Sequence, residues 1–167
     1  MKSLVRFIFR RFALCVFNFL AVPTHLYALQ KIRFLALKAI GVRLGDRIQL
    51  SEDLYIHDGR RVIIADGVRL GCFCRIWDFA EVKIGVNLLA SQNLTIISAT
   101  HDTVDYSSIS GPVDIGDDCW FGANVTIVGP VRIGRNVIVG AGSVVLKDLP
   151  DSTICAGVPC KVIRNRS

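Results

Sequence analysis

A period of six residues runs through most of the chain and restricts its fold more than any other feature. Between Val113 and Leu149, two columns of mostly apolar residues recur every six positions. The first is Val113, Cys119, Val125, Val131, Val137, Ser143 and Leu149, and the second is Ile115, Phe121, Ile127, Ile133, Val139 and Val145. An α-helix needs apolar spacing near 3.6 residues, which these thirteen positions do not match. The period favours a β-helix over chance alternation in a β-sandwich.

Each six-residue unit predicts a short strand and a tight turn. Alternate side chains of a strand point to opposite faces, so the columns point inward. Small residues such as Gly116, Gly122 and Gly134 suit the turns between strands. The units close into a prism with three flat faces and a continuous aliphatic core. The predicted fold class is therefore all-β, a parallel β-helix of hexapeptide repeats, preceded by N-terminal helices.

The repeat divides the chain into three parts. Residues 1–40 lack it, residues 41–149 carry it, and residues 150–167 drop it again and are expected to be a C-terminal tail. Within the repeat, Leu94 and Val113 are separated by three sixes plus one residue. A loop must therefore leave the prism at about residues 98–112, and loops on rigid scaffolds are where function concentrates.

The basic charge of the chain lies in its N-terminal segment. Residues 1–40 contain seven Lys or Arg and no Asp or Glu, a net charge of +7. The other 127 residues carry 13 basic and 14 acidic side chains, a net charge of −1, which accounts for the total of +6. Phe, Leu and Val dominate the basic segment, so nucleic-acid binding is not expected.

Residues 1–22 predict an amphipathic helix. Lys2, Arg6 and Arg10 share one helical face, and the apolar run after them is shorter than the roughly 20 residues of a spanning helix. The favoured interpretation is an interfacial helix that contacts a membrane. A helix packed on the protein body, and a signal or anchor segment, are the alternatives. Residues 25–40 predict a second helix, closed by Gly41.

The six cysteines are expected to be structural thiols in a reducing compartment. Cys119 falls in an inward column, and Cys72 and Cys74 form a CxC pair without a second pair at zinc spacing. A metal or redox role is the alternative. No bound metal is expected.

Four motifs follow one another in the second half of the chain. They are Ser98-Ala-Thr-His101-Asp102, Ile115-Gly-Asp-Asp-Cys-Trp120, Gly140-Ala-Gly-Ser-Val-Val145 and Ala156-Gly-Val-Pro159. In this order and spacing they resemble the hexapeptide-repeat acyltransferases of the left-handed β-helix class. The most similar branch is the sugar O-acetyltransferases, including galactoside, maltose and exopolysaccharide-type enzymes. The resemblance covers about residues 60–165, and it implies a left-handed β-helix.

The resemblance implies acetyl transfer from acetyl-CoA to a saccharide hydroxyl in cell-surface polysaccharide synthesis. A hydroxyl is a poor nucleophile at neutral pH, so a base must take its proton. His101 has that role by resemblance, and it is also the only His in the interrupting loop, whereas His25 and His57 are expected to be structural. A carboxylate or a backbone carbonyl would orient its ring, and Asp78 and Asp102 are the candidate carboxylates.

The same resemblance implies a track for acetyl-CoA. Trp120 would line the tunnel, and Ala123 and Ala141 would let the pantetheine arm approach the backbone. Lys147 and Arg164 would lie near the CoA phosphates. A backbone N–H near Gly122 or Ala123 would stabilise the oxyanion of the tetrahedral intermediate.

The family forms trimers with the active site between prisms, so a homotrimer is expected, in the cytoplasm or at the inner face of the cytoplasmic membrane. The galactoside and maltose enzymes have an Asn where this chain has Gly71, so a different acceptor is expected. N-acetylation of an amino sugar and a non-catalytic β-helix scaffold are the alternative functions.

Overall fold

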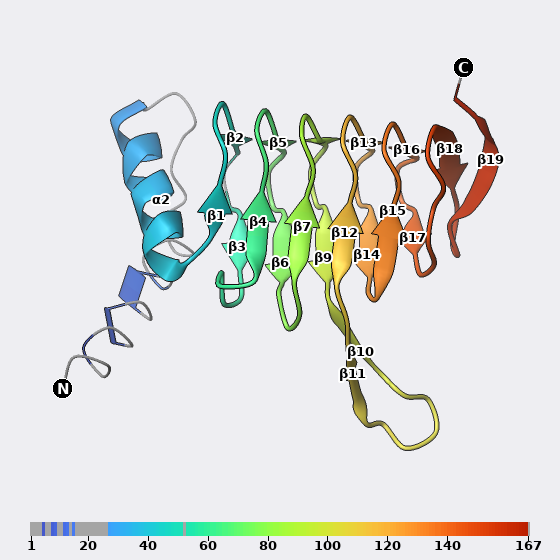
Figure 1. Cartoon of the computed structure of the whole chain (residues 1–167), viewed down its shortest axis with the longest axis horizontal. Coiled ribbons are helices and arrows are strands. Elements are labelled where there is room, and N and C mark those ends of the chain that lie inside the picture. The colour runs from blue at the N-terminus through green and yellow to red at the C-terminus, as the bar shows by residue number, and fades with distance from the viewer. Residues whose placement is uncertain are drawn as a thin grey trace.

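The computed structural model describes residues 27–166 except Glu52, together with Val5, Ile8, Phe9, Phe12, Ala13 and Cys15. The described part is a prism of short parallel strands, with a helix at one end and a hairpin that leaves one edge (Figure 1). This arrangement confirms the predicted parallel β-helix with a helix before it.

Three sheets form the sides of the prism, and the chain visits them in turn. Sheet A contains β1 (Arg43–Leu44), β4 (Val62–Ile64), β7 (Val82–Ile84), β12 (Val113–Ile115) and β15 (Val131–Ile133). Sheet B contains β2 (Gln49–Leu50), β5 (Arg69–Leu70), β8 (Leu89–Ala90), β13 (Trp120–Phe121), β16 (Ile138–Val139), β18 (Thr153–Ala156) and β19 (Lys161–Asn165). Sheet C contains β3 (Tyr55–Ile56), β6 (Arg75–Trp77), β9 (Thr95–Ile97), β14 (Thr126–Val128) and β17 (Val144–Val145).

The two predicted columns lie in the core of the prism, which continues with buried aliphatic side chains of the earlier coils. All thirteen positions are at most 5% exposed, so the inward direction of the repeat is confirmed. Burying an aliphatic side chain contributes about 1.5–3 kcal/mol relative to leaving it in water, and this gain recurs in every coil. The six cysteines are free thiols, and four of them are buried.

Two corners of the prism turn through residues with positive φ. At the A–B corner, between sheets A and B, these are Arg47, Gly67, Asn87, Asp118, Asn136 and Ser152. At the B–C corner they are Asp53, Phe73, Asn93, Asn124 and Gly142. Asn tolerates this conformation better than most residues, and Asn93 also donates to Asn124 Oδ1 at 3.0 Å in the next coil. Phe73 is the only aromatic residue at these two corners.

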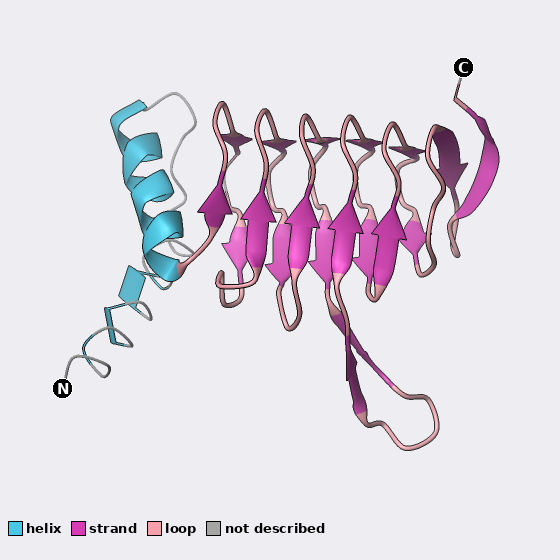
Figure 2. Cartoon of the chain, in the orientation of Figure 1, coloured by secondary structure: helices cyan, strands magenta, loops and turns pink. Residues whose placement is uncertain are grey.

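The third corner, between sheets C and A, contains the interruption of the repeat. The chain leaves the prism after β9 as a hairpin of β10 (Ala99–His101) and β11 (Ser108–Ser110), and returns at β12. Figure 2 shows both strands of this hairpin projecting beyond the coils. The predicted loop at residues 98–112 is therefore confirmed, and it has a regular antiparallel form.

The helix α2 (Tyr27–Ile40) closes the N-terminal end of the prism. Its Leu37 and Ile40 are fully buried, and the buried Arg33 donates to Ser51 O at 3.0 Å. The predicted second helix is confirmed within two residues. Most of the helix predicted for residues 1–22 lies outside the described residues, although those described there are helical. Among the helices that the structure describes, none has the length and apolarity to span a membrane.

The C-terminal segment continues the prism beyond residue 150. The strand β18 pairs in parallel with β16, and β19 then folds back antiparallel on β18. The segment expected as a tail thus contributes two strands, β18 and β19, to sheet B.

Candidate active site

The hairpin places His101 on one wall of a pocket. In an antiparallel pair, residues directly opposite each other point to the same face, so His101 and its partner Ser108 share a face with Ser110. These side chains, together with Phe79 and Ile97 of the prism, line a pocket of about 420 Å³. This volume lies in the ordinary range for small-ligand pockets, about 300–1,000 Å³.

A backbone carbonyl orients the His101 ring. The Nδ1 atom lies 3.0 Å from Tyr106 O. A carbonyl oxygen only accepts hydrogen bonds, so Nδ1 carries the proton in this contact and the neutral ring keeps a free lone pair on Nε2. Because the side chain is exposed, that nitrogen is available to take a proton from a bound molecule.

The turn between the two hairpin strands is held by its own carboxylates. Asp102 Oδ1 accepts from Val104 N at 2.7 Å and from Asp105 N at 3.3 Å, and Asp102 N donates to Ser107 O at 2.9 Å. Hydrogen bonds from Ser107 lower the pKa of the Asp105 carboxyl. The contact of the His101 ring is thus Tyr106 O, whereas Asp102, a candidate for that role, meets the backbone of the turn through Oδ1. Its carboxylate shapes the turn that presents the Tyr106 carbonyl.

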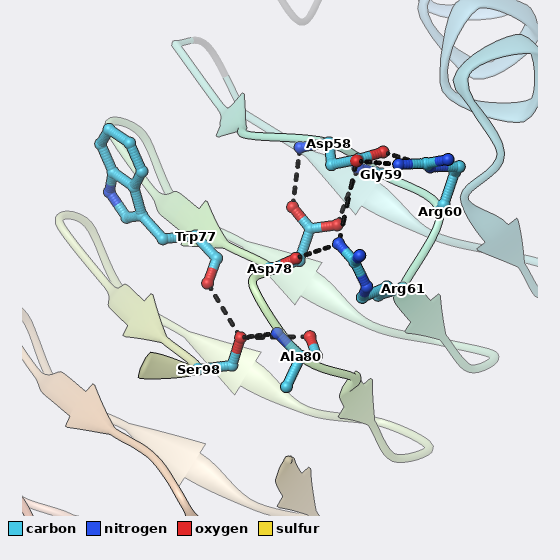
Figure 3. Close-up of polar contacts among 8 residues, drawn as sticks. All are labelled: Asp58, Gly59, Arg60, Arg61, Trp77, Asp78, Ala80 and Ser98. Carbon is cyan, nitrogen blue, oxygen red and sulfur yellow. Dashed lines mark hydrogen bonds and ion pairs between the residues drawn. The ribbon is translucent and has the colours of Figure 1, made fainter. Parts of the chain in front are cut away.

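Asp78 also has a different role from the one expected. Its side chain is fully buried at the C–A corner, where its two oxygens accept from Asp58 N and Gly59 N, both at 2.8 Å (Figure 3). Both oxygens are thus engaged with the coil before it rather than with the His101 ring. The carboxylate holds two consecutive coils together, and its role as a partner of His101 is not supported.

Ser98 connects this corner to the hairpin. Its buried Oγ accepts from Ala80 N at 2.8 Å and lies 3.1 Å from Trp77 O, as Figure 3 shows. Its carbonyl accepts from Gly111 N at 3.1 Å, which closes the base of the hairpin. The sequence motif contains Ser98, but its composition does not reveal this function, and nothing in the sequence points to the Tyr106 carbonyl.

Two of the expected CoA-binding residues lie on the outer side of sheet B. Trp120 pairs in register with Ile138, Ile138 with Ile154, and Ile154 with Arg164. Trp120 and Arg164 therefore share one row, three strands apart, or roughly 14 Å at about 4.8 Å per strand. Trp120 is 48% exposed, so its ring is free to contact a ligand.

Ala123 and Ala141 follow one another along the B–C corner. Gly142 N donates to Ala123 O at 2.8 Å, which places the two turns in contact. A Cβ on Gly122 would lie 2.6 Å from Ala141 N, so this close approach requires glycine. Gly122 N donates to Val139 O at 2.8 Å. Gly122 N therefore belongs to the sheet ladder, and an oxyanion donor at Ala123 stays a prediction.

Lys147 lies apart from these residues, exposed after β17 at the C–A corner from which the hairpin also leaves. The expected site residues therefore occupy two different edges of one chain. His101 and Lys147 belong to the C–A corner, whereas Ala123 and Ala141 belong to the B–C corner. Among the described residues, no three His, Cys, Asp or Glu side chains form a group suited to a metal ion.

Comparison with known proteins agrees with this architecture. Residues 112–147 match the family described as bacterial transferase hexapeptide (six repeats). The chain is 32% identical over 133 residues to the galactoside O-acetyltransferase of Escherichia coli K12, covering 77% of the chain and 66% of that protein. It is 28% identical over 140 residues to another protein of that strain, provisionally named a colanic acid biosynthesis acetyltransferase, covering 83% and 77%.

A solved galactoside acetyltransferase in complex with coenzyme A has the same fold. It superposes with a TM-score of 0.85 at 28% identity, over 97% of this chain and 81% of that one. The chain spans less than two thirds of the length of the E. coli galactoside enzyme and of a yeast relative, 66% and 63%.

Proposed function

The chain belongs to the hexapeptide-repeat acyltransferase family, and on that basis we propose that it transfers an acetyl group from acetyl-CoA to a saccharide hydroxyl. One observation carries the proposal. The Tyr106 carbonyl holds Nδ1 of His101 at 3.0 Å, which leaves Nε2 free beside a pocket that also contains Ser108 and Ser110. A single His with this tautomer, beside a pocket that offers two serine hydroxyls, suits a general base.

The reaction follows from this geometry. Nε2 takes the proton of the acceptor hydroxyl as its oxygen attacks the thioester carbonyl carbon. The tetrahedral intermediate then collapses, the carbon–sulfur bond breaks, and the CoA thiolate takes the proton from the imidazolium. The products are an O-acetyl saccharide and CoA with a free thiol.

The separation of the expected residues supports a homotrimeric site. His101 and Trp120 of one chain lie on different edges and faces of the prism, so a neighbouring subunit would bring the Trp120 side of its prism to the His101 hairpin. In this arrangement Trp120, Ala123 and Ala141 line the acetyl-CoA arm. Lys147 and Arg164, both exposed, meet its phosphates, where positive charge is favourable.

The test is a screen of saccharide acceptors with acetyl-CoA, read by release of free thiol and by the mass of the product. We expect His101→Ala to lose at least about a hundredfold in turnover, the scale of a lost general base, while it still binds CoA. His25→Ala, which changes a His outside the hairpin, is the matched control. Full turnover by His101→Ala would refute the mechanism.

N-acetylation of an amino sugar is the second candidate, because a His base serves both reactions. Mild alkali cleaves an O-acetyl ester and leaves an amide intact, so product analysis separates them. The relative provisionally assigned to colanic acid biosynthesis supports a role in cell-surface polysaccharide synthesis. We place the reaction in the cytoplasm, near the membrane.

The membrane contact rests on the N-terminal residues. Val5, Ile8, Phe9 and Phe12 recur at helical spacing, are 58–65% exposed, and line one apolar surface. The charge of residues 1–40 is +7 without any acidic residue, which suits an anionic lipid surface.

Flotation with vesicles that contain anionic lipid tests this contact. The variant Phe9→Ser/Phe12→Ser is expected to bind the vesicles weakly and to keep the acetyltransferase activity of the parent chain. Equal binding by a chain without residues 1–22 would remove this part of the proposal.

A further inference from the structure

Four aromatic side chains gather on the outer side of sheet C, beside the His101 pocket. Tyr55 and Trp77 have ring centroids 5.0 Å apart, and Trp77 stacks on Phe79 with an interplanar angle of 12° and centroids 6.4 Å apart. The His57 ring lies 5.6 Å from the Trp77 ring and 4.8 Å from the Phe79 ring. We call Tyr55, His57, Trp77 and Phe79 the aromatic platform.

The aromatic platform is continuous with the floor of the pocket. Trp77 pairs in register with Ile97, and both Ile97 and Phe79 line the pocket. One coil further from the hairpin, His57 N donates to Ile76 O at 3.0 Å, which places His57 beside Trp77. Neighbouring coils lie about 4.8 Å apart, so the row from Ile97 to His57 extends roughly 10 Å along the prism.

The fold does not require aromatic side chains at these positions. They lie outside the aliphatic core, and the equivalent outer row of sheet A is mostly charged: Asp114 pairs in register with Lys83 and Arg132, and Ile63 follows Lys83. Phe79 is 44% exposed. A gathered group of aromatic rings on an outer face, next to a pocket with a free base, marks a binding surface.

The chemistry of the aromatic platform suits a sugar ring. One face of a pyranose carries mainly C–H groups, which pack on aromatic rings, while its hydroxyls at the edge stay in water. Ser108 and Ser110 provide polar contacts in the pocket itself, whereas the aromatic platform provides flat apolar area. The pocket therefore suits the sugar that reacts, and the aromatic platform suits a neighbouring sugar.

We propose that the aromatic platform is a second saccharide subsite, so the acceptor has at least two linked sugar rings. This inference rests on the proposed acetyl transfer to a saccharide. The ring that is acetylated occupies the pocket beside His101, and the next ring lies across Trp77 and His57.

The experiment compares matched acceptors. Glucose, galactose, mannose and N-acetylglucosamine are each supplied as the methyl glycoside and as a corresponding methyl disaccharide, and kcat/KM with acetyl-CoA is measured for both. We expect the disaccharide to be preferred about tenfold for the productive sugar, the scale of one aromatic packing contact. Trp77→Leu and His57→Ala should remove this preference, so that the ratio of the two kcat/KM values falls to about one.

Val128→Ala is the matched control, because Val128 pairs in register with Ile97 on the side away from the aromatic platform. It should keep the preference. Binding is read independently in a Trp120→Phe background, where Trp77 is the only tryptophan of the chain. Its emission should change with the disaccharide and not with the monosaccharide.

The possible results of these experiments bear differently on the second subsite and on the proposed function. Acetyl transfer without a disaccharide preference, or a preference that survives Trp77→Leu, overturns the second subsite and leaves the proposed function intact. Absence of transfer to every saccharide by the unaltered protein overturns both. A change in the mass of the assembly in Trp77→Leu, measured by light scattering, would assign the aromatic platform to contact with another copy of the chain and overturn the subsite.

Discussion

Replacing Asp78 tests whether its carboxylate has a structural role or a catalytic one. In Asp78→Ala, Asp58 N and Gly59 N lose the acceptors that each meets at 2.8 Å. A buried donor without a partner costs about 1–3 kcal/mol, so the two together cost roughly 4 kcal/mol. For a chain of this size, 1 kcal/mol lowers Tm by about 2–4 °C, which predicts a loss of roughly 8–16 °C. Asp78→Asn keeps one acceptor oxygen and should lose about half as much.

The assay is thermal unfolding followed by circular dichroism, with turnover measured at a temperature at which both variants are folded. We expect a lower Tm with turnover and its pH profile close to those of the parent. Asp102→Ala, which removes an acceptor from an exposed turn, is the matched control and should change Tm little. An unchanged Tm combined with a hundredfold loss of turnover in Asp78→Ala would show that Asp78 acts on the reacting groups and would refute the structural role.

Four further predictions each rest on a single feature of the chain. Phe73 adopts φ 61° at a position where the next coils have Asn93 and Asn124. Phe73→Asn should therefore raise the free energy of unfolding in urea by about 1 kcal/mol. An unchanged or lower urea midpoint would contradict the backbone strain at Phe73. Gly122→Ala should destabilise the fold by about 1–3 kcal/mol, because the added Cβ would meet Ala141 N at 2.6 Å. Gly142→Ala is the control, because its Cβ meets open space and only its positive φ is unfavourable. A Tm of Gly122→Ala equal to that of the parent would contradict the close approach. Burial raises the pKa of the Cys74 and Cys119 thiols to about 11, so at pH 8 iodoacetamide should label the exposed Cys15 first and these two only after unfolding. An unfolded thiol loses its proton near pH 9, whereas these folded thiols keep it until about pH 11. The free energy of unfolding should therefore fall as the pH rises from 9 to 11. A flat Tm from pH 8 to pH 11 would contradict the raised pKa of the two thiols.

The repeat made most of the fold predictable. Side-chain direction in a strand alternates with a period of two, and a six-residue unit keeps that phase from coil to coil, so Val113 to Leu149 could be placed inside before any contact was known. The interruption between Leu94 and Val113 located the hairpin for the same reason. Beyond Pro150 the period stops, and β18 nevertheless continues sheet B, because Ile154 pairs with Ile138 through backbone groups that leave no mark in the sequence.

The site was predictable only as far as it depends on side-chain identity. His101 was singled out by its residue type and by its position in the loop. Its orienting partner is the Tyr106 carbonyl, and every residue except proline carries the same backbone groups, so no residue type could have indicated it. Asp78 illustrates the opposite case, since a carboxylate one coil away was a reasonable partner until its hydrogen bonds to Asp58 N and Gly59 N were known.

The sequence by itself therefore determined the prism, the inward columns, the hairpin that leaves it and the histidine on that hairpin, because each depends on local periodicity or residue type. The tertiary structure decided which groups meet. It assigned Asp78 and Asp102 to holding the backbone, gave the orientation of His101 to a carbonyl, took Gly122 N into the sheet ladder, and brought Trp77 and Phe79 of one coil together with His57 of another. These contacts join residues that are distant in sequence, and only the stacking of coils brings them within reach of one another.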